Sequence, residues 1–183
     1  MEALTDVVRM GKVRYIGFSE FPPELIQRSV ELTRERGFEK FVSSQPEYSL
    51  LWRAPEDEVI PLCRGNEISQ VVWSPLAEGV LTGKYRPGSP PPAETRATSD
   101  RMGATIVWRL DEATLDRVER LRSIAERLGY TTAQVALAWI LRDDNVAVPI
   151  VGASRPDQVR ENAAAADIDL DPETIAEIEA VFV

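Results

Sequence analysis

Short apolar runs alternate with helical patterns along this chain. Each run is rich in β-branched or aromatic residues and does not alternate cleanly between apolar and polar positions, which is typical of strands covered on both faces of a parallel sheet. The pattern predicts four strands, at Val13–Phe18, Phe41–Ser44, Gln70–Ser74 and Val146–Val151.

The segments between these runs carry apolar residues at the spacing of amphipathic helices. The clearest stripe runs over Leu115–Leu128 and is followed by Gly129, a residue type that often ends a helix. Because strands and helices alternate in order, the pattern predicts an α/β fold. Further helices are expected at Leu4–Gly11, Leu25–Leu32 and Glu56–Arg64, after a capping box of Thr131 with Gln134, after a cap formed by Ser154 with Asp157, and from Asp171-Pro172.

Residues 86–102 interrupt this alternation. Arg86–Arg96 is rich in Pro, Gly and Ser and is too long for a tight turn, so we expect an irregular excursion near a binding face. A linker between two domains is the alternative. Since the same strand and helix patterns resume afterwards, we predict a single domain over residues 1–183. The helix at Leu4–Gly11 follows no strand, so we expect the chain to open in the middle of a strand–helix unit.

Composition narrows the classes of function. The net charge of −9 disfavours binding to nucleic acid or to anionic membranes. No apolar run approaches the roughly 18 residues of a membrane span, and the first residues lack the apolar core of a signal peptide. The single cysteine, Cys63, is expected to be buried and inert, and it fits a cytoplasmic location. The chain has no histidine, which excludes histidine-based catalysis and histidine metal sites on it, so no metal is expected.

Four segments taken together resemble aldo-keto reductases, closest to the bacterial branch similar to potassium-channel beta subunits. The segments are Gly11–Glu20, Gln45–Leu50, Trp73–Tyr85 and Gly152–Asn162, and in this order they extend over nearly the whole chain. The resemblance implies a (β/α)8 TIM barrel and matches these segments to its fifth to eighth strands. A complete barrel needs about 250 residues and eight strands. The expectation is therefore a carboxyl-terminal half-barrel, with four parallel strands and outer helices.

The catalytic residues of that family lie in the other half. They are an aspartate, a tyrosine, a lysine and a histidine from the first four strands and their loops. No segment of this chain matches those motifs, so we assign no catalytic residue to it.

What the resemblance does imply is a site for NADP(H). An expected helix start after Gly152 offers backbone N–H groups and a positive dipole end to an anion. By resemblance, Ser154, Gln158, Glu161 and Asn162 hold the adenosine 2′-phosphate and the adenine. From the residues alone, the favoured interpretation is that Ser154 is a simple helix cap and that the rest is a solvated helix face. Many relatives carry a lysine near Gly152, and this chain does not.

The nicotinamide end of the site is expected at the carboxyl ends of the other strands. By resemblance, Trp73 stacks on the nicotinamide ring, while Gln45 and Ser19 bind its carboxamide. Trp73 as a core side chain is the alternative, and Trp139, which has no match, is expected in the core. Glu20 replaces the asparagine or arginine of many relatives. The remaining expected cofactor contacts are Ser74, Pro75, Leu76 and Lys84, with Arg96 and Arg101 as weaker candidates.

Two kinds of function follow. The first is the NADP(H)-binding part of a carbonyl reductase, not catalytically competent alone. The second is a non-catalytic pseudoenzyme or half-barrel oligomer with a nucleotide-binding or assembly role. In both cases the unpaired edges of a half-barrel predict self-association or pairing with a complementary amino-terminal half. The sequence does not name a substrate.

Overall fold

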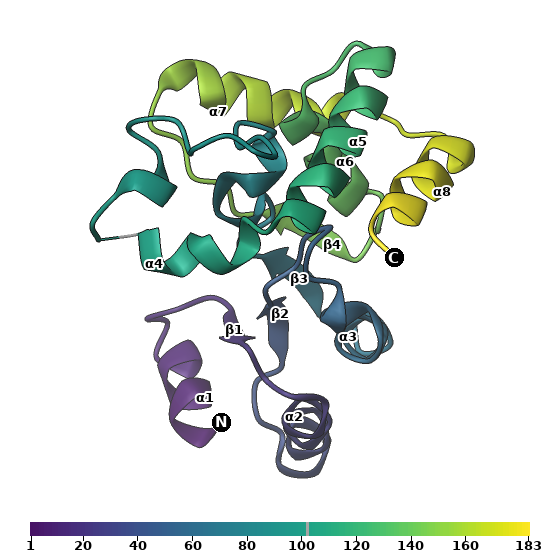
Figure 1. The fold of residues 1–183 in the computed structure, drawn as a ribbon. Coiled ribbons are helices and arrows are strands. Elements are labelled where there is room, and N and C mark those ends of the chain that lie inside the picture. The colour runs from purple at the N-terminus through teal and green to yellow at the C-terminus, as the bar shows by residue number, and fades with distance from the viewer. Residues whose placement is uncertain (102) are drawn as a thin grey trace.

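The computed structural model describes residues 1–101 and 103–183. Its strands form one parallel sheet in sequence order, as predicted (Figure 1). They are β1 (Ile16–Ser19), β2 (Phe41–Gln45), β3 (Ser69–Val72) and β4 (Val146–Pro149). Four parallel strands with flanking helices are the α/β arrangement expected of part of a (β/α)8 barrel.

All four strands depart from their predicted bounds, β2 only by ending one residue later, at Gln45. β1 begins three residues later than predicted, and the apolar side chains before it are exposed, Tyr15 by 75%. β3 and β4 each end two residues earlier than predicted. Trp73 keeps an isolated bridge to Glu47, but Ser74 turns into the left-handed region with a φ of 51°. The apolar runs continue beyond the residues that pair with neighbouring strands, so apolar composition does not show where a strand begins or ends.

The predicted helices are present, with two starts misplaced: α3 begins three residues later than predicted, and the start of α7 also differs. Asp111 caps α5 by accepting a hydrogen bond from the Thr114 N–H at 3.0 Å, and α5 ends at Gly129. The Thr131–Gln134 capping box opens α6 as predicted. The helices are α1 (Glu2–Arg9), α2 (Pro23–Arg36), α3 (Val59–Arg64), α4 (Gly103–Ile106), α5 (Glu112–Leu128), α6 (Thr132–Leu141), α7 (Pro156–Ala163) and α8 (Pro172–Val181).

The excursion after β3 is largely irregular, as expected. Residues 86–95 form no helix or strand, and a short 3-10 helix follows at Arg96–Thr98. The structure places this excursion against the segment after β4, because an Arg96 Nη atom lies 3.7 Å from the position of a Cβ on Gly152. Of the predicted excursion, Met102 lies outside the described residues.

The two faces of the sheet are unlike each other. One is buried under the outer helices and presents Ile16, Phe18, Val72 and Val146. The other carries small residues over β1 to β3, where Gly17, Ser43 and Ser69 are in register. A Cβ on Gly17 would lie 2.2 Å from the Ser43 Oγ atom, so the close approach of these strands requires glycine there.

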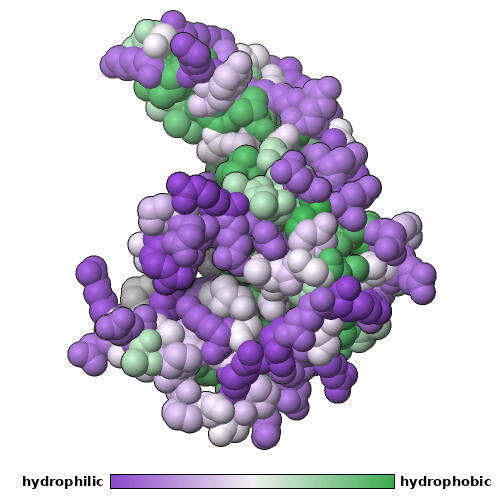
Figure 2. All heavy atoms as spheres, turned by 90° about the horizontal axis from the view of Figure 1, so that it is seen from above, coloured by the Kyte–Doolittle hydropathy of each residue, from purple (hydrophilic) through white to green (hydrophobic). Residues whose placement is uncertain are grey.

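Two apolar side chains are exposed at β4 and just after it. Val148 is 47% exposed and Ile150 is 43% exposed. Seen from above, the surface is notched on one side, and hydrophobic side chains reach the surface around the notch (Figure 2). The uncovered sheet face is therefore less apolar than a filled barrel interior would be.

The core lies between the sheet and the outer helices. Trp139 on α6 is fully buried against Tyr48, as expected for a core side chain. Cys63 on α3 is fully buried in a second, smaller cluster with Phe18 and Phe41, and burial raises the pKa of its thiol. Both features confirm the reading of these residues as structural. Among residues 1–101 and 103–183, no helix combines the length and the hydropathy needed to cross a bilayer.

Candidate functional site

The carboxyl ends of the four strands meet at one edge of the sheet, where α/β proteins commonly bind ligands. Ser19 ends β1 and Gln45 ends β2, so both lie at strand ends, as predicted. The Ser19 hydroxyl donates a hydrogen bond to the Gln45 backbone carbonyl at 2.8 Å. The Gln45 side-chain amide makes no hydrogen bond with a described residue, and it is half-buried. Its donor and its acceptor are therefore both available to a ligand.

Trp73 follows β3 directly and is held at several points. Its backbone N–H donates to the Pro46 carbonyl at 3.0 Å, and its own carbonyl accepts from the Tyr48 N–H at 3.2 Å. The indole Nε1 donates to a Glu20 carboxylate oxygen at 2.7 Å. The half-buried ring is thus fixed in orientation at the same edge as Gln45.

The loop after Trp73 is tightly wound. Ser74, Ala77 and Glu78 all have positive φ angles, of 51°, 46° and 59°, and Gly79 has a φ of 99°. This winding folds the segment back, so that a Cβ on Gly79 would lie 2.9 Å from the ammonium nitrogen of Lys84. The loop therefore places the ammonium group of Lys84 close to the backbone of Gly79.

A cavity of about 510 Å³ lies between this loop, the excursion and the segment after β4. It brings together seven of the predicted cofactor contacts: Ser74, Pro75, Leu76, Lys84, Gly152, Ser154 and Gln158. Arg96, a weaker candidate from the sequence, also lines it. Neither Lys84 nor Arg96 forms an ion pair with any described residue. Lys84 and Arg96 can therefore each contact an anion, while the carboxylates of Glu78 and Glu94 in the same wall oppose its charge.

The start of α7 differs from the prediction. Ser154 and Asp157 do not cap it: the helix begins at Pro156, and the Gln158 side chain fills the capping role. The Gln158 Oε1 atom accepts from the Ser154 N–H at 2.8 Å, the Ser154 hydroxyl at 3.2 Å and the Arg155 N–H at 3.2 Å. The backbone N–H groups expected to be free are thus occupied by Gln158. An anion at this helix start must take over those hydrogen bonds.

Other predicted contacts lie outside the cavity wall. Ser19, Gln45 and Trp73 stand at the neighbouring strand ends, and Glu161 and Asn162 lie further along α7. Asn162 lines a separate, mainly apolar cavity of about 310 Å³ beside β4. The backbone carbonyl of Glu161 accepts a hydrogen bond from Gln134 at 3.2 Å.

Two acidic residues in the wall were not anticipated from the sequence. Glu78 and Glu94 line the cavity, and one carboxylate oxygen of Glu78 is buried without a hydrogen bond to a described residue. No pattern in the sequence around Glu78 or Glu94 predicts this position, because the wound loop after β3 and the excursion bring them to the cavity wall. Arg101 does not line the cavity.

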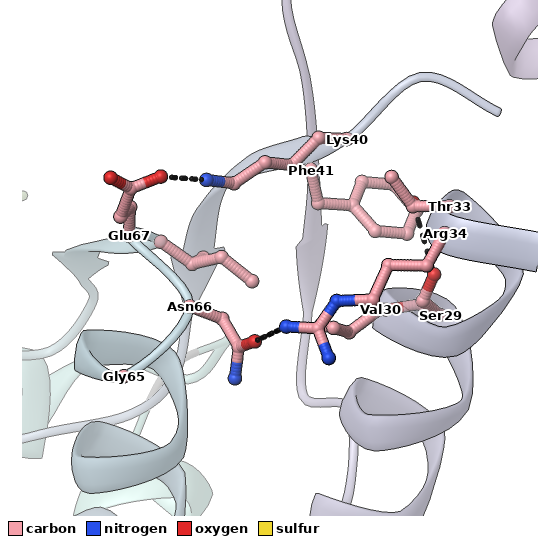
Figure 3. A pocket seen from close by; sticks show the side chains of 10 residues that line it. Ser29, Val30, Thr33, Arg34, Lys40, Phe41, Gly65, Asn66 and Glu67 are labelled. Carbon is pink, nitrogen blue, oxygen red and sulfur yellow. Dashed lines mark hydrogen bonds and ion pairs between the residues drawn. The ribbon is translucent and has the colours of Figure 1, made fainter. Parts of the chain in front are cut away.

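A second cavity, of about 400 Å³, lies at the opposite end of the strands between α2 and α3 (Figure 3). Lys40 is paired with Glu67 at 2.7 Å, and Arg34 donates a hydrogen bond to the neutral Asn66 side chain at 3.3 Å. This cavity contains none of the predicted cofactor contacts, so it is the weaker candidate site.

Comparison with known proteins shows a match over nearly the whole chain. The sequence model described as the aldo/keto reductase family matches residues 1–182. The L-glyceraldehyde 3-phosphate reductase of Escherichia coli (strain K12) is 35% identical over 164 residues, which cover 89% of this chain and 47% of that protein. A putative voltage-gated potassium channel subunit beta of Schizosaccharomyces pombe is 34% identical over 185 residues, covering 100% of this chain and 54% of that protein.

A fungal enzyme gives a similar result. The versiconal hemiacetal acetate reductase of Aspergillus parasiticus is 35% identical over 185 residues, covering 100% of this chain and 52% of that protein. The chain therefore spans about half the length of the curated relatives it matches.

Proposed function

Because the chain belongs to the aldo/keto reductase family, we propose that it is the carboxyl-terminal, NADP(H)-binding part of an oxidoreductase that reduces carbonyl groups to alcohols. The observation that carries this proposal is the cavity of about 510 Å³ at the carboxyl ends of the strands, which gathers cofactor contacts that the sequence predicts separately. The family's catalytic aspartate, tyrosine, lysine and histidine belong to a half that this chain does not match.

Two basic side chains of the cavity can contact the phosphates of a dinucleotide. Lys84 and Arg96 supply two unpaired cations for a pyrophosphate, and charge-assisted hydrogen bonds to phosphate are among the stronger polar contacts in proteins. Gly152 has no side chain, so the ligand can approach the backbone beside Arg96.

The adenosine end of the cofactor is assigned to the start of α7. Ser154 and Gln158 lie there in the cavity wall, and Glu161 and Asn162 follow on the same helix. A 2′-phosphate would accept hydrogen bonds from the Ser154 and Arg155 N–H groups in place of Gln158, at the positive end of the helix dipole. This exchange favours NADP(H) over NAD(H), which lacks that phosphate.

The nicotinamide end is assigned to the neighbouring strand ends. Trp73 offers an aromatic face for stacking, while Gln45 and Ser19 offer donors and acceptors to the carboxamide. The cofactor supplies the hydride when it is bound. The residues of this chain orient the ring and fix which face it presents.

The rest of the proposal concerns the whole protein. The three relatives described above carry different names, so we propose no substrate beyond a carbonyl compound. The partner is either a complementary amino-terminal half-barrel or a second copy of this chain. The single cysteine is buried, which suits the reducing cytoplasm that we propose as the location.

A non-catalytic role is the second candidate. Several relatives are named as potassium channel beta subunits, and the chain has unpaired sheet edges that favour assembly. A nucleotide-binding subunit would keep the same cavity but would never join a catalytic half. The sequence encoded upstream of Met1 separates the two candidates, because upstream family motifs would indicate an enzyme.

Titration with NADPH, followed by tryptophan fluorescence, tests the proposed site. We expect saturable but weak binding, since part of the binding surface belongs to the missing half. Gln158→Ala and Trp73→Ala should each lower the affinity, measured by calorimetry where the fluorescent reporter is removed. Trp108→Phe is the matched control, because Trp108 is exposed and does not line the cavity. Unchanged affinity in both site variants would show that the assignment is wrong.

A further inference from the structure

Glu20 joins the ends of three strands through one carboxylate oxygen. The residue directly follows β1. Its Oε1 atom accepts a hydrogen bond from the backbone N–H of Glu47, just beyond β2, at 2.8 Å. The same atom accepts a second hydrogen bond from the indole Nε1 of Trp73, just beyond β3, at 2.7 Å.

The backbone at Glu20 is adapted to this arrangement. Its φ angle is 55°, in the left-handed region that few residues other than glycine adopt without cost. A strained conformation persists only where the surroundings hold it in place. The two hydrogen bonds are charge-assisted, so they supply a stabilisation that offsets this strain.

The neighbouring groups make the arrangement rigid. The carboxylate of Glu47 is paired with Arg109, and both side chains are largely buried. The backbone of Trp73 is bonded on both sides to the segment after β2. The ring of Trp73 is the one part of the residue that these bonds leave free to rotate, and Glu20 binds the only polar atom on that ring.

We propose that Glu20 is a positioning residue, which holds the Trp73 indole in a fixed orientation and thereby sets how a planar ring stacks on it. This inference rests on the proposed function for the identity of the stacking ring, which would be nicotinamide. The hydrogen bond itself does not depend on that function. Glu20 acts through Trp73 and is not a catalytic residue.

The first test observes the indole directly in the chain without ligand. The sequence contains four tryptophans, so a ¹⁵N-labelled sample gives four indole resonances, and Trp73→Phe identifies the one from Trp73. We expect that Glu20→Ala moves the Trp73 indole proton upfield, because its hydrogen bond to a carboxylate is lost. Glu20→Gln keeps an amide oxygen that accepts the same bonds and should retain most of the downfield shift. A Trp73 resonance that is the same in wild type and Glu20→Ala would overturn the proposal.

The second test is a double-mutant cycle on NADPH affinity. Glu20→Ala should weaken NADPH binding about three- to tenfold, the size of the net contribution of an ordinary hydrogen bond. Glu20→Gln should restore most of that loss. In a Trp73→Phe background, where no indole N–H exists, Glu20→Ala should have little further effect. An equal loss in both backgrounds would mean that Glu20 does not act through Trp73, and the proposal would be wrong.

Glu24→Ala provides the matched control for charge. Glu24 is exposed, lies four residues further on, and makes no ion pair with a described residue. It should leave both the indole resonance and the affinity unchanged, and a loss equal to that of Glu20→Ala would contradict the proposal. If wild type shows no saturable NADPH binding, the proposed function fails, while the indole resonance still decides whether Glu20 holds Trp73.

Discussion

Lys84 and Arg96 are the two side chains on which the charge of the site depends. They come from different segments, the loop after β3 and the excursion, and both line the same cavity. Neither has an acidic partner among the described residues, whereas many other basic side chains in the structure are paired. A bound anion would provide the missing counter-charge.

We expect Lys84→Ala and Arg96→Ala each to weaken NADPH binding about three- to tenfold, because each removes a charge-assisted contact that is partly screened by solvent. The loss should shrink as ionic strength rises, since salt screens exposed charges. Calorimetric titration at low and at high salt measures both effects. Lys12→Ala is the matched control, as Lys12 is exposed and does not line the cavity. If Lys12→Ala weakened NADPH binding equally, the effect would come from the change in net charge and not from a contact in the cavity.

Single residues also show where sequence reasoning reaches its limit. Ser19, Gln45 and Trp73 could be placed at strand ends because each follows its own apolar run. Glu78 and Glu94 could not be placed in the wall, since a loop winding through positive φ angles and an irregular excursion bring them there. Glu20 looked only like a departure from the family pattern, and its role depends on contacts with two distant segments.

At the scale of elements, local signals predicted the helices well. The Thr131–Gln134 capping box of α6 was predicted, because its partners lie three residues apart. The Asp111 cap of α5 is equally local but was not predicted. The start of α7 was misplaced because a different side chain caps it. Gln158 reaches back to the N–H groups of Ser154 and Arg155, and it takes the capping role expected of Ser154 with Asp157. Strand ends were less predictable, because they depend on pairing with distant residues.

The cap of α5 provides a prediction with a definite pH dependence. Hydrogen bonds from the Thr114 hydroxyl and backbone N–H lower the pKa of the Asp111 carboxyl in the folded chain. The ionised Asp111 carboxylate therefore contributes its full share of the free energy of unfolding above the pKa that this group has in the unfolded chain. That contribution is lost as pH falls through the lower pKa that the group has in the folded chain.

We expect Asp111→Ala to reduce the free energy of unfolding by about 1 kcal/mol at neutral pH, the usual cost of losing an N-cap. The difference from wild type should shrink in acid to about the size seen between Asp111→Asn and Asp111→Ala, since a protonated carboxyl keeps one acceptor oxygen. Denaturant unfolding at a series of pH values measures this. Asp111→Asn retains an acceptor oxygen and should lose less. A deficit in Asp111→Ala that stays constant down to acid pH would contradict the assigned role of the carboxylate.

At the scale of the whole molecule, the sheet is open at both edges. No further strand among the described residues pairs with the outer sides of β1 and β4. The uncovered face over β1 to β3 is lined by small residues, so less apolar surface is left wet than in an opened, filled barrel. Apolar side chains are exposed at both edges, Val13 and Tyr15 just before β1 and Val148 and Ile150 at β4 and just after it. We expect association to begin at these edges.

We expect the chain to self-associate at micromolar concentration unless a complementary half is present. Sedimentation velocity over a range of concentrations measures this. Val148→Lys puts a charge on the β4 edge and should shift the distribution toward monomer, whereas Lys12→Ala should not. A wild-type chain that sediments as a monomer throughout would show that the open face and edges are stable in water.

The chain alone is expected to lack carbonyl reductase activity. No side chain matches the family's general acid, and such an acid typically contributes about 10²–10⁴-fold to the rate. Oxidation of NADPH in the presence of a generic aldehyde measures turnover. Rates typical of the family from the purified chain would contradict this expectation, and they would require a proton donor among residues that we assign only to binding.

The central claim is that NADP(H) binds in the cavity between the loop after β3, the excursion and the start of α7. Mapping the backbone amide resonances of a ¹⁵N-labelled chain during titration with NADP⁺ tests it most directly. We predict that the perturbed amides cluster at Ser74–Lys84 and at Gly152–Gln158, with smaller changes at the ends of β1 and β2. If these amides stay unmoved while those around the α2–α3 cavity shift, or if no amide shifts at saturating concentration, the site assignment is wrong.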